Sequence, residues 1–90
     1  VFIASPKDGS GQLDCGLLGE NIILSAQSMG VGSCCLGGII SFMNSDIAKD
    51  FYKRLNLPSD YQLLYAIALG YPDESPAAKP RDTSKIQWVK

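Results

Sequence analysis

The sequence contains no histidine, and its three cysteines, Cys15, Cys34 and Cys35, form no CxxC pair. A zinc site would therefore lack its usual ligands, and we expect no metal centre. The same absence removes the Ser/His and Cys/His pairs that activate nucleophiles in many hydrolases. Any demanding chemistry must then come from a bound cofactor.

The chain also lacks a charge bias and a long apolar run. Its net charge is −1, with 8 cations and 9 carboxylates spread along the sequence. Without a basic field we expect neither nucleic acid nor an anionic membrane as a partner. No apolar stretch approaches the roughly 18 residues of a membrane-spanning helix. An odd cysteine count, with an adjacent pair that closes a disulfide poorly, favours a reducing cytoplasm.

The length allows one domain or less. A chain of 90 residues buries only roughly 60–65% of its unfolded surface, so apolar surface is left over for a partner. The sequence opens directly on an apolar run, Val1–Ala4, without an initiator methionine. This abrupt start suggests a piece of a longer protein.

Local patterns predict an α+β chain with an extended C-terminal arm. The continuously apolar segment 1–4 is typical of a strand covered on both faces, and 61–69, which has no polar face, of a central strand. Apolar residues at helical spacing predict a long helix over 12–29 and a second, amphipathic helix over 47–55. The prolines after residue 71 favour an extended arm over 72–90. Within it, Ile86–Val89 alternates and predicts either a short terminal strand or a clasp on a neighbour, with Trp88 as its anchor.

The long predicted helix carries more apolar surface than a surface helix needs. Leu13, Leu17, Leu24 and Met29 form a stripe that further apolar residues widen. Gly16 and Gly19 within it each cost about 0.5–1 kcal/mol relative to alanine. Close helix packing or a subunit interface would offset that loss.

The segment Gly30–Gly38 has four glycines in nine residues and few reactive side chains. Glycine permits positive φ and lets backbone N–H groups approach a ligand, so the segment favours binding of a flat ring. The alternative interpretation is a tight connection between two elements. Cys34 and Cys35 have no charged neighbour that would stabilise a thiolate, so we expect small buried residues rather than redox centres. Tyr65 and Tyr71 are interpreted as strand packing and turn residues.

Three parts of the sequence resemble the nitroreductase family in their order along the chain. The run Asp14–Ala26, continued by Met29–Cys34, looks like the central helix of that family and the loop after it. Ala68–Pro72 matches a second part, and Lys79-Pro80-Arg81 with Ile86-Gln87-Trp88 a third. The resemblance covers nearly the whole chain, and it is to the C-terminal half of the family.

The resemblance implies an FMN-dependent NAD(P)H oxidoreductase of α+β fold, built as an intertwined homodimer with flavin at the subunit interface. By this resemblance Cys35, Leu36, Gly37 and Gly38 lie against the isoalloxazine ring. The Gly37 backbone N–H then points to flavin N5 and is the one catalytic group. Lys79 and Arg81 match the basic pair that holds the FMN phosphate, a role suited to a forked guanidinium and a compact ammonium.

The expected reaction passes hydride from NAD(P)H through flavin to an electron-poor acceptor such as a nitroaromatic or a quinone. A backbone donor at N5 needs no titrating side chain, so the lack of histidine fits this chemistry. The N-terminal basic segment of the family has no counterpart in the chain, and we expect the 90 residues alone to be inactive. The alternative is a non-enzymatic fragment that oligomerises and binds no flavin on its own.

Overall fold

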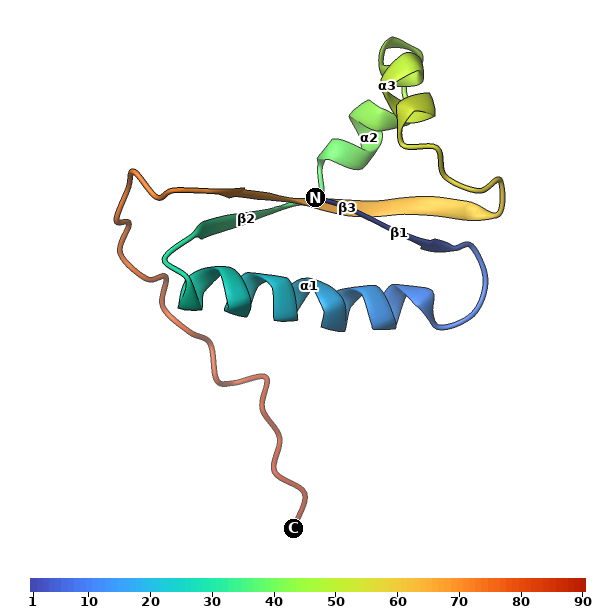
Figure 1. Ribbon diagram of the computed structural model, residues 1–90. Helices are drawn as coiled ribbons and strands as arrows, with labels where there is room; N and C mark the ends of the chain where they lie inside the picture. The colour runs from blue at the N-terminus through green and yellow to red at the C-terminus, as the bar shows by residue number, and fades with distance from the viewer.

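The computed structural model describes residues 1–90 as a three-stranded antiparallel sheet between helices. The strands are β1 (Phe2–Pro6), β2 (Gly32–Leu36) and β3 (Tyr61–Gly70), in the order β1-β3-β2. Figure 1 shows α1 (Gly11–Ser28) along one face of the sheet; on the other side lie α2 (Ile39–Met43), the short 3₁₀ helix η1 (Asp46–Ala48) and α3 (Lys49–Arg54). The expected α+β fold is confirmed.

The strand predicted over 61–69 is β3, and it lies at the centre of the sheet as expected. Its Ile67 is the largest fully buried side chain. The strand predicted over 1–4 is β1, an edge strand of this sheet. Its residues alternate, with Ile3 and Ser5 buried and Phe2 46% exposed. The expected coverage of both faces is absent because a single helix layer lies against this end of the sheet.

The helix predicted over 12–29 is α1, but its largest apolar residues do not face the sheet. The buried residues of α1 are the small ones, Cys15, Gly19 and Ala26. Leu13, Leu17 and Leu24 lie on the opposite side of the helix and are 67%, 62% and 58% exposed. The sheet comes closest to the helix at Gly19, where a Cβ would overlap the Tyr65 hydroxyl, and the three leucines remain outside.

The glycine-rich segment was expected to be a loop, and this expectation is partly wrong. Gly32–Leu36 forms β2, which pairs with β3 from Gly32↔Gly70 to Leu36↔Ala66. The segment has no proline or charge to oppose pairing, and the open edge of β3 supplies the hydrogen-bond partners. Cys34 and Cys35, expected to be buried, are exposed because β2 is itself an edge strand.

The second predicted helix, 47–55, is divided into η1 and α3, and α2 precedes them. Ser45, whose extended backbone (φ −80, ψ 160) interrupts the helical path, separates α2 from η1. The division between η1 and α3 lies at Ala48, whose backbone (φ −94, ψ 5) departs from the helical values. These short helices still enclose a core. Met43, Ala48 and Leu63 are buried together, with five partly buried apolar residues around them: Ile39, Ile40, Tyr52, Leu55 and Leu57.

Residues 71–90 leave the body of the molecule and form no helix or strand. Figure 1 shows this arm passing the C-terminal end of α1 and continuing beyond that helix. The terminal strand considered for Ile86–Val89 is therefore absent, and Trp88 is 83% exposed. The radius of gyration, 16.3 Å, exceeds the roughly 12 Å of a compact chain of this length. None of the helices combines the length and the apolar character that a membrane-spanning segment requires.

Candidate functional site

The residues Cys35, Leu36, Gly37 and Gly38 lie at the end of β2 and in the turn that leads to α2. All four are exposed. The Gly37 C=O accepts the Ile40 N–H at 3.4 Å, whereas the Gly37 N–H has no acceptor within the chain. An exposed backbone donor without a partner is therefore present at Gly37, the position that the family resemblance implied.

The free edge of β2 extends this feature. The N–H and C=O of Ile67 both bond to the N-terminal residue beside β1. In an antiparallel sheet bonded pairs alternate, so the β3 residues on either side of Ile67 direct their backbone groups to Cys34 and Leu36. The backbone groups of Ser33 and Cys35 consequently point to the open edge. With Gly37 they form one row of polar backbone groups, which we call the β2 edge.

The glycines of this turn are not required by the chain's own geometry. Of the four in 30–38, only Gly30 adopts a positive φ, 73°. A Cβ added to Gly37 or to Gly38 would meet no atom within 4 Å. The turn therefore borders open space rather than a packed neighbour, and it offers no general acid or base for chemistry by itself.

The two predicted phosphate ligands lie on the exposed arm. Arg81 Nη1 donates to the Lys79 C=O at 2.9 Å. Ser84 donates to Asp82 Oδ1 from its N–H at 2.9 Å and from its hydroxyl at 2.5 Å. These two hydrogen bonds hold the pKa of the Asp82 carboxyl below its usual range. Figure 1 shows the arm beyond Glu74 running past α1, away from the turn at the base of α2, so within a single chain this part of the arm lies apart from the Gly37 turn.

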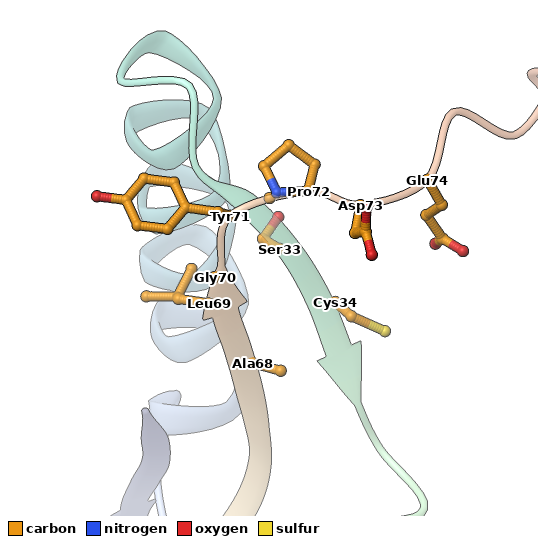
Figure 2. Close-up of a pocket in the computed structure, with 10 residues that line it drawn as sticks. Ser33, Cys34, Ala68, Leu69, Gly70, Tyr71, Pro72, Asp73 and Glu74 are labelled. Carbon is orange, nitrogen blue, oxygen red and sulfur yellow. The ribbon is translucent and has the colours of Figure 1, made fainter.

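A separate open groove of about 440 Å³ lies where β2 begins and β3 ends. Figure 2 shows Cys34 and Ala68 on one side of this strand pair and Leu69 and Tyr71 on the other. Apart from the beginning of β2, the groove is lined by Ala68–Glu74. It contains none of the six predicted site residues. Only the pairing of the strands creates it, so no local sequence signal would have revealed it.

Comparisons with known proteins find relatives of one family. The model of the nitroreductase family matches residues 4–71. An NADPH-flavin oxidoreductase of Vibrio harveyi is 38% identical over 71 residues, which are 79% of this chain and 28% of that protein. An oxygen-insensitive NADPH nitroreductase of Salmonella typhimurium is 32% identical over 71 residues, again 79% of this chain and 28% of that protein.

Two solved structures share the fold. A nitroreductase with bound FMN from Bacteroides fragilis superposes with a TM-score of 0.80 at 23% identity, over 97% of this chain and 48% of that one. A second nitroreductase with bound FMN, from Desulfitobacterium hafniense, superposes with a TM-score of 0.75 at 30% identity. The superposition covers 91% of this chain and 44% of that one.

The fold is thus that of the solved nitroreductase structures over about half of their length. The family match covers well over half of the residues, and this chain belongs to the nitroreductase family. It spans less than a third of the length of the curated relatives it matches.

Proposed function

We propose that this chain is the C-terminal half of an FMN-dependent oxidoreductase domain, with residues 72–90 as its extended arm. In this function hydride passes from NAD(P)H through the flavin to an electron-poor acceptor such as a nitroaromatic or a quinone. The observation that carries the proposal is the unpaired Gly37 N–H beside open space. Relatives named as NADPH-flavin oxidoreductase and NADPH nitroreductase support it.

The β2 edge fits the rim of a flat heteroaromatic ring. Such a rim alternates hydrogen-bond donors and acceptors, and the edge offers backbone groups of both kinds at Ser33, Cys35 and Gly37. The absence of a Cβ at Gly37 and Gly38 allows a ring to approach the backbone closely. FMN, when bound, supplies the hydride chemistry. The protein's part is to hold the ring and to direct the Gly37 N–H at the atom where charge changes.

Lys79 and Arg81 complete the proposed site by binding the FMN phosphate. The arm projects from the body of its own chain (Figure 1), which suits a flavin held between two copies. Arg81 gives up only an exposed bond to a backbone carbonyl when it turns to a phosphate. Three free cysteines agree with a cytoplasmic location.

The absorption spectrum of the purified protein tests this proposal. We expect the full-length protein that contains these 90 residues to be yellow with flavin bands, and its FMN content to fall on dialysis against high salt because the phosphate contacts are ionic. Added NAD(P)H should bleach the bands. A folded, colourless protein that takes up no added FMN would contradict the proposal and would favour the non-enzymatic oligomerising fragment.

Assembly is a second part of the proposed function. Leu13, Leu17 and Leu24 are large apolar side chains exposed on the outer side of α1. Large apolar side chains exposed together rarely stay uncovered in a monomer, and a second copy of the chain would bury them. We therefore propose a homodimer or a higher homo-oligomer.

Light scattering at micromolar concentration tests the assembly. We expect a mass of at least twice the 9.7 kDa of the chain. Leu17→Lys should shift the protein toward monomer, because it places a charge among the exposed leucines, whereas Ser25→Lys, exposed on the flank of α1, should not. A folded monomer of 9.7 kDa would contradict this prediction.

A further inference from the structure

Tyr65 reaches from the central strand β3 to the backbone of α1. Its hydroxyl donates to the Cys15 C=O at 2.5 Å. Gly19 lies directly beneath the ring: a Cβ there would overlap the Tyr65 hydroxyl oxygen and lie 3.0 Å from Cζ. Gly19 is buried, so a larger side chain could not turn out to solvent. The tyrosine hydroxyl therefore occupies the space that the missing side chain leaves.

The surroundings of this hydroxyl favour its protonated form. Burial raises the pKa of Tyr65 above its ordinary value, the thiols of Cys35 and Cys15 raise it further, and a hydrogen bond from the Gly19 backbone lowers it less. Because the raised pKa favours the neutral form, the O–H remains a donor to α1 throughout the physiological range. Cys15 adds a weak contact from its thiol to the Ala4 C=O at 3.7 Å. One turn of α1 is thus fastened to both β3 and β1.

The fastening of α1 also affects β2. Only residues 29–31 separate the end of α1 from the start of β2, and the Val31 N–H still bonds to Ala26 of the helix at 2.9 Å. As an edge strand, β2 has β3 on one side only and α1 packed against its face. A displacement of α1 is therefore passed directly to the β2 edge.

We infer that the Tyr65 hydroxyl, seated over Gly19, is a positioning group that fixes α1 on the sheet and thereby aligns the β2 edge through Gly37. Tyr65 touches neither the turn nor its open space, so its role is indirect. The consequence for flavin rests on the proposed function above. The consequence for α1 and β2 belongs to the chain itself and is measurable without flavin.

A double-mutant cycle tests the contact between Tyr65 and Gly19. Gly19→Ala should lower the midpoint of thermal unfolding although alanine favours helices, because its Cβ collides with the tyrosine oxygen. Gly16→Ala is the matched control: a Cβ at that position meets no atom within 4 Å, so the midpoint should stay or rise slightly. Adding Tyr65→Phe to Gly19→Ala should restore part of the lost midpoint, because it removes the colliding atom. Additive effects, or equal effects of the two alanines, would overturn the inference.

Amide hydrogen exchange tests the positioning role of Tyr65 separately from its effect on stability. In Tyr65→Phe, the amides of Cys34 and Leu36, which bond β2 to β3, should exchange with solvent about five- to ten-fold faster, the loss that one hydrogen bond predicts. The Ala48 amide in the α2–α3 core should be unaffected. Tyr71→Phe, a change in a 93% exposed tyrosine, is the control and should alter neither.

The rate of flavin reduction in the FMN-containing protein is the third measurement. Tyr65→Phe should slow flavin reduction by NAD(P)H about ten-fold, because a small misplacement of the Gly37 N–H weakens a contact that matters most during hydride transfer. A wild-type protein without flavin would contradict the proposed function, and the cycle and the amide exchange would still decide the inference. Unchanged exchange at β2 in Tyr65→Phe would overturn the positioning role and leave Tyr65 with stability alone.

Discussion

Replacing Gly37 by proline should abolish hydride transfer to bound flavin while most of the fold survives. Proline has no N–H, so the proposed donor to flavin N5 is lost, and one missing preorganised donor costs about 10²–10³ in rate. The fold should tolerate the change because Gly37 precedes α2 and its N–H holds no bond within the chain. Stopped-flow reduction of the flavin by NAD(P)H measures the effect.

Two controls separate backbone chemistry from cysteine chemistry in this prediction. Gly37→Ala keeps the N–H, and its Cβ meets no atom of the chain within 4 Å, so it should retain far more activity than proline. Changing Cys34 and Cys35 together to serine should leave the rate within a few-fold of wild type. Since both thiols are exposed, the stability cost should stay within about 0.5 kcal/mol. A rate abolished by the serines but untouched by proline would refute the role of Gly37.

Replacing Arg81 by alanine should weaken FMN binding by about ten- to a hundred-fold. A forked guanidinium makes two charge-assisted hydrogen bonds to phosphate, and their loss typically costs roughly 1.5–3 kcal/mol. Lys79→Ala should cost less, because an ammonium is a single compact charge. Titration of the apoprotein with FMN, followed by flavin fluorescence, gives the affinities.

Lys85→Ala is the matched control for the arm, because it removes a cation from the same exposed segment outside the predicted pair. It should lower FMN affinity only slightly, through the general field of the arm. Equal affinities for the wild type and Arg81→Ala would show that the phosphate is held elsewhere. Equal losses for Arg81→Ala and Lys85→Ala would show that the arm contributes only its net charge.

The sequence by itself predicted the helices and strands that form because of their own residue pattern. The uninterrupted apolar run of β3 predicts a strand that cannot face water, and the helical spacing of residues 12–29 predicts α1 whatever the helix packs against. The α+β class and the family followed from these elements and from the motifs between them. The glycine-rich segment 30–38 with few reactive groups also pointed to its backbone, and the family resemblance singled out Gly37 within it.

Only the tertiary structure decided what each element faces. The pattern of α1 could not show that Gly19 and Cys15 turn inward and the leucines outward, because that choice depends on how closely the sheet approaches. Gly32–Leu36 became a strand because β3 had an open edge, a partner more than 25 residues away in the chain that no local signal records. The contact of Tyr65 with Gly19 likewise joins residues that the sequence separates. The sequence therefore determined the features that have local causes, whereas strand pairing and close packing were decided by the tertiary structure.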